Sequence, residues 1–459
     1  MTHRTISPDA VDDARTRFRG RLVGPSDPAY DEVRRVHNGL IDRRPALVAR
    51  CAGTSDVVTT LELAREHGLE VSVRGGGHNV AGRAVVDGAV MVDLAPMTGV
   101  HVDPHRRTAR AGGGATWRDF NRETQLHGLA TTGGVVSTTG IAGLTLGGGL
   151  GHLMPAFGMA VDNLLSAEVV LADGRVVTAN EEQEPDLFWA VRGGGGNFGV
   201  VTSFEYRLHP VSTVTGGLAL HPFDRAREVL AFYRDFTREL PDPVMAFGGL
   251  VHAPDGSGQK FAAIMVCDCR PPGSDETEVR AVKEFGPPAV DAIQPMPYEA
   301  VNQLLDAGYP KGALNYWKSS FLEELSDEAI DAMVEAFSRA PSPMDALLLE
   351  HFHGAPTRVP VEATAFPYRQ PGYNFAVMAQ WMDPSLTEAG IAWSRATYEA
   401  MRPHLAASRY VNYLGDDEPP EEVRSAYGPN LPRLQRLKAR YDPENVFRHN
   451  QNIRPAEDD

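Results

Sequence analysis

Cysteine is scarce in this chain. Only Cys51, Cys267 and Cys269 occur among 459 residues. So few thiols exclude a small domain held together by disulfides. The pair Cys267 and Cys269 lacks the spacing of a zinc knuckle, and no suitable histidine pair lies near it. We therefore predict no metal site and expect all three cysteines to be ordinary structural residues.

Positive charge and long apolar runs are also lacking. Lysine and arginine number 44 against 60 aspartates and glutamates, which leaves a formal net charge of −16. This charge repels nucleic acid and anionic membranes, so neither is expected as a partner. No apolar run approaches the roughly 20 residues of a membrane span, and the polar residues 1–10 lack the core of a signal peptide. We expect a soluble cytoplasmic protein with a small-molecule substrate, and the oligomeric state stays open.

Glycine, by contrast, is abundant, with 45 residues. The first of three clusters lies between Val73 and Gly82 and reads Val-Arg-Gly-Gly-Gly-His-Asn-Val-Ala-Gly, directly after a β-like run. Three residues without a Cβ let backbone N–H groups close around a phosphate. Arg74 would add charge-assisted hydrogen bonds to the same anion, and His78 leaves the loop with an imidazole beside the ligand.

Two further glycine clusters occupy residues 131–152 and 192–199. So much glycine is entropically costly unless a large polar ligand, such as a dinucleotide, needs close backbone approach. The third cluster contains a G-x-G-x-x-G pattern, which in a Rossmann site must precede a helix. Here residues 200–208 read as a strand. The pattern therefore does not indicate a Rossmann fold.

The length predicts two domains, and the residue pattern of the chain changes near residue 210. Before that point, short strands and helices alternate around the glycine loops. After it, amphipathic helices alternate with strand-like runs such as 248–252 and 261–266. This pattern favours an antiparallel sheet with helices on one face, so the fold class is α+β.

Five stretches, in this order, resemble one known family: 73–82, 133–163, 186–202, 410–413 and 441–455. With them the chain resembles the FAD-linked oxidases of the vanillyl-alcohol-oxidase/p-cresol-methylhydroxylase (PCMH) superfamily, in the berberine-bridge-enzyme-like branch and near its bacterial secondary-metabolism oxidases. The resemblance implies a two-domain fold with a PCMH-type FAD-binding domain over 1–210 (core about 43–211). An antiparallel-sheet substrate domain would span 211–402, and the segment 403–459 would return to the FAD domain.

The same resemblance implies how FAD is held. A histidine at the position of His78 bonds covalently to the 8α-methyl carbon of the flavin in this family. Many relatives add a link from a cysteine, but here Val136 stands at that position, so we expect a single covalent link. The implied cofactor-binding residues are Arg74, Gly75, Gly76, Gly77, His78, Asn79, Gly82, Gly140, Gly143, Thr145, Gly147, Gly148, Gly149, Gly199, Val200, Asn450 and Asn452.

Candidates for catalysis lie in two places. Tyr410 and Tyr413 are expected on one strand, where a spacing of three places the two phenols on opposite faces. The resemblance favours Tyr413 as the base. Glu350, on the strand-like run 347–353, is the alternative, with His351 and His353 on the other face of that strand. These two histidines are too few for a metal site.

The resemblance implies that a substrate C–H bond passes a hydride to flavin N5 while a base takes a proton, and that dioxygen reoxidises the flavin to give hydrogen peroxide. Val161 stands where relatives have a residue bordering the oxygen path, and its small side chain favours an oxidase. Three alternatives stay open: a dehydrogenase with another acceptor, an oxidative cyclase or dual oxidase of a secondary metabolite, and a non-redox flavin-binding scaffold. The substrate (alcohol, phenol, amine or polyketide-like) cannot be inferred from the sequence.

Overall fold

The N-terminal half of the molecule begins with a four-stranded sheet of order β1-β2-β4-β3. The computed structural model of the chain describes residues 6–253 and 255–456, so the outermost residues of the predicted domains lie outside it. Strands β2, β3 and β4 run parallel, and β1 is antiparallel to β2. The elements are α1 (Pro8–Arg17), β1 (Arg21–Val23), α2 (Tyr30–Val33), β2 (Leu47–Arg50), α3 (Thr54–Glu66), β3 (Val71–Arg74) and β4 (Val90–Asp93).

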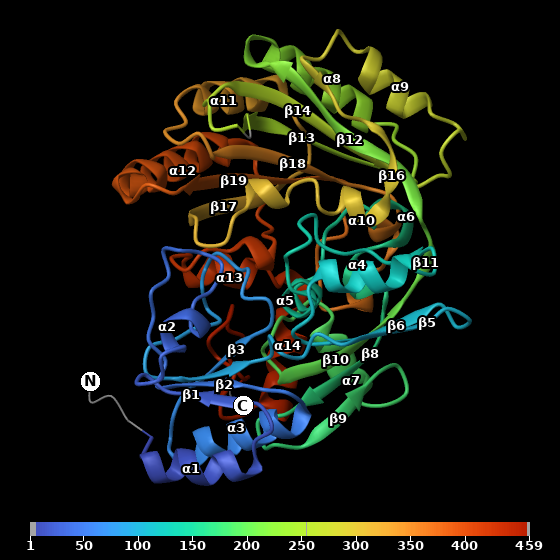
Figure 1. Cartoon of the computed structure of the whole chain (residues 1–459). Helices are drawn as coiled ribbons and strands as arrows, with labels where there is room; N and C mark the ends of the chain where they lie inside the picture. The colour runs from blue at the N-terminus through green and yellow to red at the C-terminus, as the bar shows by residue number, and fades with distance from the viewer. Residues whose placement is uncertain (1–5, 254, 457–459) are drawn as a thin grey trace.

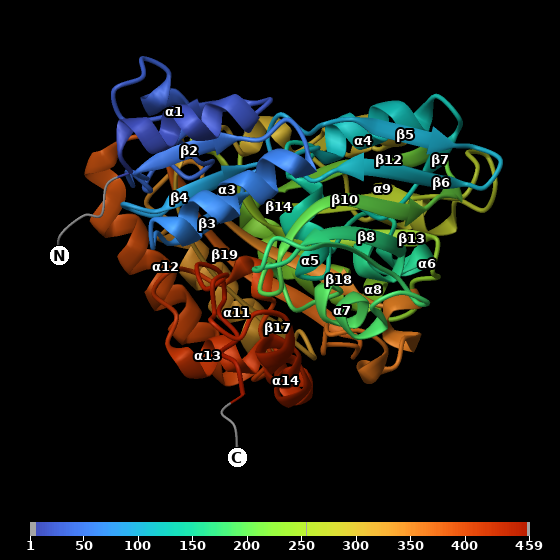
Figure 2. The same cartoon turned by 90° about the horizontal axis from the view of Figure 1, so that it is seen from below.

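A five-stranded antiparallel sheet of order β5-β6-β10-β8-β9 packs beside the first (Figure 2). Strand β10 directly follows the third glycine cluster, so the prediction of a strand there is confirmed and the Rossmann alternative is excluded. The elements are β5 (Val100–Asp103), β6 (Thr108–Gly112), α4 (Trp117–Gln125), β7 (Leu129–Ala130), α5 (Ile141–Leu146), α6 (Met154–Phe157), β8 (Leu164–Val170), β9 (Val176–Ala179), α7 (Pro185–Val191), β10 (Val200–Arg207) and β11 (His209–Pro210).

The second half of the chain is built on an eight-stranded antiparallel sheet. Its order is β15-β12-β14-β13-β18-β19-β17, and β16 pairs with β12. The α+β prediction is confirmed. The strands are β12 (Thr213–Pro222), β13 (Val244–His252), β14 (Lys260–Asp268), β15 (Val290–Asp291), β16 (Gln294–Pro297), β17 (Leu314–Leu322), β18 (Ala346–Phe352) and β19 (Gly372–Trp381).

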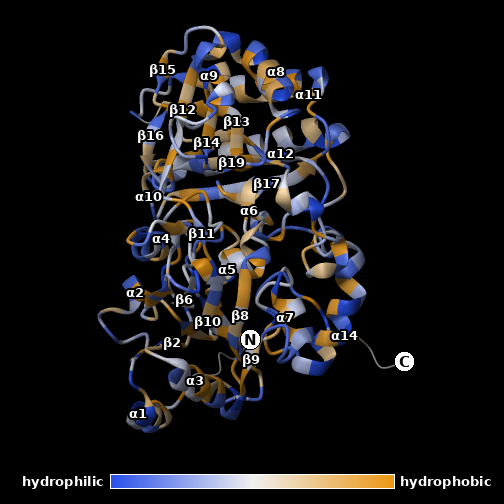
Figure 3. Cartoon of the chain, turned by 90° about the vertical axis from the view of Figure 1, so that its right-hand side faces the viewer, coloured by the Kyte–Doolittle hydropathy of each residue, from blue (hydrophilic) through white to orange (hydrophobic). Residues whose placement is uncertain are grey.

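Helices cover only one face of the large sheet (Figure 1). They are α8 (Ala226–Thr237), α9 (Thr277–Glu284), α11 (Asp327–Ser338) and α12 (Thr387–Met401), while the short α10 (Tyr298–Val301) lies apart from them. Their apolar sides form one core with alternate strand residues such as Leu347 and Leu349. Inner strands such as β13 and β14 are largely hydrophobic, whereas many surface loops are hydrophilic (Figure 3). The opposite face of the sheet, which carries Leu348 and Glu350, is therefore turned toward the N-terminal half.

After α12 the chain crosses back to the N-terminal half (Figure 1). This segment includes α13 (Pro420–Ser425) and α14 (Leu431–Tyr441). Leu434, Leu437 and Tyr441 of α14 share a core with residues of α7, β8 and β10. The polypeptide thus contributes to the cavity described below from three separate stretches.

The sequence also predicts a helix over residues 27–37, capped by Ser26, and another over residues 298–306, and both are much shorter in the structure. Residues 27–37, for which Ser26 was the expected cap, contain only α2, with Ala29 at the N-cap, because the Asp27 carboxylate accepts from the Ala29 N–H and pairs with Arg21. Residues 298–306 contain only α10. Just after α10, the Asn302 side chain donates to the Gly134 carbonyl, and this hydrogen bond holds the segment against the N-terminal half of the molecule.

Candidate active site

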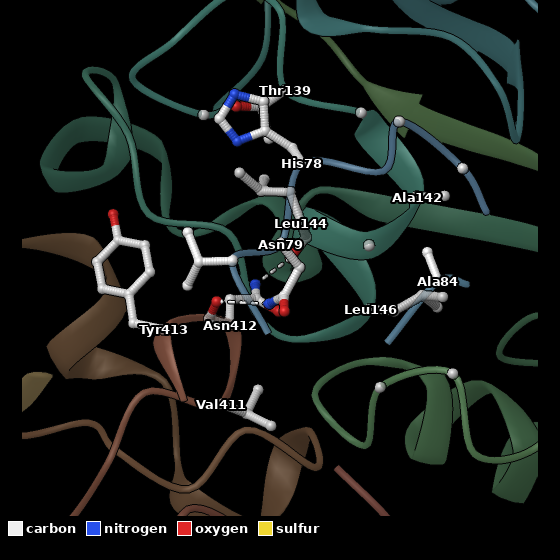
Figure 4. A pocket seen from close by; sticks show the side chains of 18 of the residues that line it. His78, Asn79, Ala84, Thr139, Ala142, Leu144, Leu146, Val411, Asn412 and Tyr413 are labelled. Carbon is white, nitrogen blue, oxygen red and sulfur yellow. Dashed lines mark hydrogen bonds between the residues drawn. The ribbon is translucent and has the colours of Figure 1, made fainter. Parts of the chain in front are cut away.

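A deep cavity lies where the two halves and the returning C-terminal segment meet. Its empty space, including the mouth, is about 1720 Å³. Figure 4 shows that the lining comes from the glycine loops on one side and from Asn412 and Tyr413 on the other.

The first two glycine clusters touch each other at the floor of the cavity. A Cβ on Gly76 would lie 2.5 Å from both N and Cα of Gly140, closer than any real side chain permits. Both residues line the cavity. The loops can therefore approach only as bare backbone, which leaves peptide groups facing a ligand. A Cβ on Gly143 would meet no atom and would project into open space.

His78 lies on the first loop with its ring turned toward the second. Its Nε2 is 3.5 Å from the Thr138 hydroxyl, and its ring stacks on that of His37 with centroids 3.9 Å apart. Burial, together with His37, lowers the pKa of His78 to about 3. The imidazole is therefore neutral at physiological pH, which is the protonation state a nitrogen nucleophile requires.

Arg74 does not reach the cavity, contrary to the expectation that it would bind an anion. Its Nε and Nη2 donate to the two carboxylate oxygens of Asp93 at 2.9 and 2.5 Å, and Nη1 donates to the Val33 and Arg35 carbonyls. The guanidinium is buried beneath the loop and supports it from below. Arg83, five residues after His78, lines the cavity instead, and its buried Nε has no hydrogen-bond partner.

Tyr410 and Tyr413 do not lie on a strand, so that prediction is wrong. Residues Val411–Tyr413 form a 3₁₀ turn, in which residues three apart share a face. Both rings therefore line the cavity, edge to face, with centroids 5.0 Å apart. The Tyr410 hydroxyl accepts from the Gly149 N–H at 3.0 Å and from Asn412 Nδ2 at 2.9 Å, whereas the Tyr413 hydroxyl is free of the backbone.

Tyr413 and Glu350, the two alternative bases, are hydrogen-bonded to each other. The Tyr413 hydroxyl donates to Glu350 Oε1 at 3.1 Å, and Asn374 Nδ2 donates to Oε2 at 2.5 Å. Burial raises the pKa of Glu350 to about 7, although both donors favour its ionised form. Burial and the nearby Glu350 charge raise the pKa of Tyr413 well above its usual value. At neutral pH, Glu350 is thus the proton acceptor of the pair.

Four residues of the large-sheet domain, which the sequence did not single out, complete this end of the cavity: Leu305, Tyr309, Trp317 and Met378. Trp317 on β17 is paired in register with Met378 on β19. The Tyr309 hydroxyl lies 3.2 Å from the sulfur of Met378. By contrast, other aromatic residues of the large sheet lie in core clusters outside the cavity, among them Phe321, Phe352, Tyr373 and Trp381. We call the space bordered by Tyr309, Trp317, Met378, Glu350 and Tyr413 the substrate chamber.

The structure brings most, but not all, of the predicted site residues to the cavity. Lining it are Gly75, Gly76, Gly77, His78, Asn79, Gly140, Gly143, Gly199, Asn450, Glu350, Tyr410 and Tyr413. Not lining it are Arg74, Gly82, Thr145, Gly147, Gly148, Gly149, Val200, Asn452 and Val161.

The residues outside the cavity have packing roles that explain their positions. A Cβ on Gly147 would overlap the side chain of Asn412, and one on Gly82 would overlap Ile41. Thr145 shares a hydrogen bond with the buried Tyr206 hydroxyl at 2.7 Å. Gly147 therefore lets the returning segment pack against the second loop, while Gly82 and Thr145 pack against elements of the N-terminal half.

Val161 is fully buried in a core cluster with Leu150, Leu153 and Met159 and does not border the cavity. Val136, at the position where relatives carry a cysteine, does line it. The three cysteines are free, and none of them lines the cavity. Within the described ranges, no group of three metal-ligating side chains occurs, and no helix there is long and apolar enough to cross a membrane.

The chemistry of the cavity wall fits FAD. Buried polar atoms without a partner lie along its wall, among them Asn450 Oδ1, Gln451 Oε1 and Arg83 Nε. Leaving such atoms unsatisfied is costly, and a polar ligand with its own donors and acceptors would satisfy them. His449, Gln451 and Tyr427 had not been predicted here. The Asn-Gln-Asn motif, of which only the outer residues were chosen, was the signal for Gln451.

Comparison with known proteins agrees with this geometry. Residues 45–180 match a family model described as an FAD binding domain, and residues 409–454 match one described as berberine and berberine like. The chain is 31% identical to (R)-6-hydroxynicotine oxidase of Paenarthrobacter nicotinovorans, over 95% of this chain and 97% of that protein. It is 29% identical to the uncharacterized FAD-linked oxidoreductase YgaK of Bacillus subtilis (strain 168), over 96% and 98%.

Solved structures have the same architecture. The crystal structure of 6-hydroxy-D-nicotine oxidase from Arthrobacter nicotinovorans superposes with a TM-score of 0.87 at 28% identity, covering 96% of this chain and 98% of that one. Xylooligosaccharide oxidase from Myceliophthora thermophila C1 gives 0.84 at 23% identity over 98% and 100%, a likeness of fold alone. The chain therefore belongs to the berberine-bridge-enzyme-like family of FAD-linked oxidoreductases.

Proposed function

We propose that this FAD-dependent oxidoreductase is an oxidase that removes a hydride from a small organic substrate and uses dioxygen as the final acceptor. The observation that carries the proposal is the buried Glu350–Tyr413 pair on the wall of the cavity that the glycine loops also line. When bound, FAD accepts the hydride and passes the electrons on to dioxygen. The name of one relative, (R)-6-hydroxynicotine oxidase, favours an oxidase over a dehydrogenase.

The residues of the chain supply the proton chemistry. The Tyr413 hydroxyl donates its proton toward Glu350, which leaves a lone pair on the phenol oxygen for the proton of the substrate. As the substrate proton reaches Tyr413, the phenol proton moves to Glu350, so no charged phenolate has to form. The raised pKa of about 7 suits Glu350 to accept and release this proton at neutral pH. Asn374 fixes the orientation of the carboxylate.

We also propose that FAD is joined to the protein by a single covalent link at His78. The neutral imidazole and its contact with Thr138 support this role, and Val136 leaves no thiol in the loop for a second link. Among the described lining residues the cavity contains no cysteine. A small-molecule substrate and dioxygen are then the partners that the reaction needs.

A substrate screen under anaerobic conditions tests the proposed reaction. The yellow holoenzyme is mixed with alcohols, phenols, amines and polyketide fragments, and a substrate bleaches the flavin. Admission of air should restore the colour and release one hydrogen peroxide per cycle. A reduced flavin that air does not reoxidise, but an electron carrier does, would identify a dehydrogenase, and the mass of the product separates simple oxidation from cyclisation.

Rapid mixing of variants with the first substrate found then tests the proton acceptor. Glu350→Gln and Tyr413→Phe should each slow flavin reduction by roughly 10²–10⁴-fold with little change in substrate affinity. In the parent enzyme the rate should rise with pH to a plateau, with a midpoint near the Glu350 pKa of about 7, because only the ionised carboxylate accepts a proton. Reduction at the parent rate in both variants would refute this assignment.

A further inference from the structure

A second histidine ring lies flat against the ring of His78. The centroids of the His37 and His78 rings are 3.9 Å apart, and the two ring planes differ by 21°. His37 is buried and lies outside the lining of the cavity. The proposed function uses His78 but gives no part to His37.

Hydrogen bonds fix the segment around His37 from both halves of the molecule. The His37 N–H donates to the Gly77 carbonyl of the first glycine loop, and its carbonyl accepts from the Gly312 N–H of the large-sheet domain, both at 2.9 Å. Asn38 Nδ2 donates to the Asn315 carbonyl, and Asn38 Oδ1 accepts from the Asn315 N–H, also at 2.9 Å. The His37 ring is therefore carried by a rigid support, against which a mobile side chain can rest.

The geometry of the stack makes His37 a surface for His78 and not a base. The lone pair of an imidazole nitrogen lies in the plane of its ring, so a nearly parallel ring presents its face, not its lone pair, to its neighbour. His37 Nε2 is buried without a hydrogen-bond partner. Burial and the charge of Lys311 lower the pKa of His37 to about 4, so at physiological pH the ring is neutral and adds no charge beside the nucleophile.

Such a surface matters because His78 must attack in one orientation. A free imidazole side chain rotates about two bonds, and fixing it costs conformational entropy that adds to the barrier of the reaction. The His37 face restricts the His78 ring to one plane, and the Thr138 hydroxyl lies at the ring edge, 3.5 Å from Nε2. The ring contact thus removes part of the entropy that the bond-forming step would otherwise lose.

We propose that His37 is a positioning residue for flavin attachment, and that its ring face holds the His78 imidazole in the plane from which the nitrogen attacks FAD. This inference rests on the proposed link at His78 and extends it, because it names the residue that sets the rate of the bond-forming step. His37 acts through His78 and lies outside the lining of the cavity.

Attachment balances in atoms and electrons. A proton leaves the 8α-methyl carbon of FAD, the His78 nitrogen bonds to that carbon, and the N–H proton of the imidazole is released. The two electrons of the broken C–H bond stay in the flavin ring, which takes up the two protons and is reduced. Dioxygen then accepts two electrons and two protons, becomes hydrogen peroxide, and returns the flavin to its oxidised form.

The time course of covalent labelling tests this role. Full-length chain, produced with limiting riboflavin so that much of it is free of flavin, is mixed with FAD in air, and the fluorescence of the acid-precipitated band is followed. His37→Ala should slow labelling by roughly three- to tenfold, the size of a typical aromatic contact, and should still reach the final extent of the parent. His37→Phe keeps a ring but has no nitrogen, and its rate should lie within about twofold of the parent rate.

Two further variants separate a stacking role from a general effect on folding. His37→Asn keeps a side-chain nitrogen without a ring and should be as slow as His37→Ala. His353→Ala removes one ring from the stacked pair of His351 and His353, whose centroids are 4.2 Å apart outside the cavity, and should match the parent. The flavin absorbance of each protein before precipitation gives the FAD that it binds, so the rates are compared per bound FAD.

The outcomes distinguish this inference from the proposed function. Parent-like labelling of His37→Ala and His37→Asn would overturn the role of His37 and leave the link at His78 standing. A His37→Phe variant as slow as these two would also overturn it, because a ring nitrogen would then be required. A parent that binds FAD but never acquires a covalent label would refute the link itself, and with it this inference. Labelling needs no substrate, so a failed substrate screen would leave the result unchanged.

Discussion

The raised pKa of the buried Glu350 makes the stability of the folded protein depend on pH. Its folded-state pKa of about 7 lies above the usual 4.5, so between these values the folded protein binds a proton that the unfolded chain has lost. The stability that this proton contributes is fully present below pH 4.5 and is lost as pH rises through about 7. Glutamine cannot lose a proton and avoids that loss.

The free energy of unfolding of Glu350→Gln should therefore gain on that of the parent as pH rises from 4.5 to 8, by on the order of 3 kcal/mol. Denaturant unfolding of both FAD-loaded proteins at several pH values measures the difference. Glu323→Gln, an exposed glutamate, should track the parent throughout. A difference that shrinks with rising pH would show that Glu350 is not held in a site that disfavours its charge.

His78 is expected to carry the flavin, and no other residue should. After acid precipitation and a denaturing gel, the parent band should fluoresce under ultraviolet light, and digestion should place the label on one peptide that contains His78. His78→Ala should release all its flavin on precipitation. The matched variant His37→Ala, which removes the stacked neighbour, keeps the nucleophile and should keep the label. Label on a cysteine peptide would contradict the single link.

Side-chain contacts between distant stretches limit what the sequence reveals about single residues. Arg74 is a residue type that binds anions and lies next to a glycine loop. In the structure, however, its guanidinium pairs with Asp93 on the neighbouring parallel strand. Trp317 faces the chamber only because its strand pairs in a particular register with β19. The positions of His78 and Glu350 on the cavity wall were predictable, because each belongs to a local pattern, a glycine loop and an apolar strand.

At the scale of elements, the first two glycine loops touch each other through the backbone of Gly76 and Gly140. Gly76→Ala should push the first loop away from Gly140, since its Cβ would fall 2.5 Å from backbone atoms that cannot move aside easily. The purified variant should contain much less FAD than the parent, as measured by the ratio of absorbance at 450 and 280 nm. Gly99→Ala, whose Cβ would meet no atom, is the matched control. Full FAD content in Gly76→Ala would show that the contact does not shape the site.

Regular elements were predictable where local patterning sets them and failed where tertiary contacts do. The sequence of residues 327–338 predicts a helix, and α11 has these bounds, because the Ser326 cap and an amphipathic repeat specify it locally. The turn at Val411–Tyr413 was predicted as a strand, because tyrosine and valine favour strands. Its conformation depends on Asn412, which donates to the distant Leu144 carbonyl, and that contact leaves no trace in the local sequence.

At the scale of the whole molecule, the fold class and the two-part architecture followed from the change of texture near residue 210 and from the resemblance of the glycine loops and tail to one family. In the sequence, the return of the C-terminal segment to the N-terminal half is indicated only by the motif in residues 441–455. In the structure it is anchored by Lys438, whose ammonium donates to the Asn197 and Phe447 carbonyls and to Asp442 at 2.7, 3.0 and 2.6 Å. Both charged side chains are fully buried.

The hydrogen bonds of Lys438 should determine whether the C-terminal segment stays packed against the N-terminal half. Lys438→Met keeps most of the volume but leaves Asp442 charged, buried and unpaired, which should lower the free energy of unfolding by about 3–5 kcal/mol. Because Asn197 lines the cavity and Phe447 lies two residues before His449, which also lines it, FAD should also dissociate or be lost during purification. Arg440 lies two residues after Lys438 on α14 and forms an exposed ion pair with Asp186. Arg440→Met breaks this pair and should lower the free energy of unfolding by less than about 1 kcal/mol. Denaturant unfolding and FAD content of the two variants measure this contrast, and equal, small losses in both would mean that the segment is held by its apolar contacts alone.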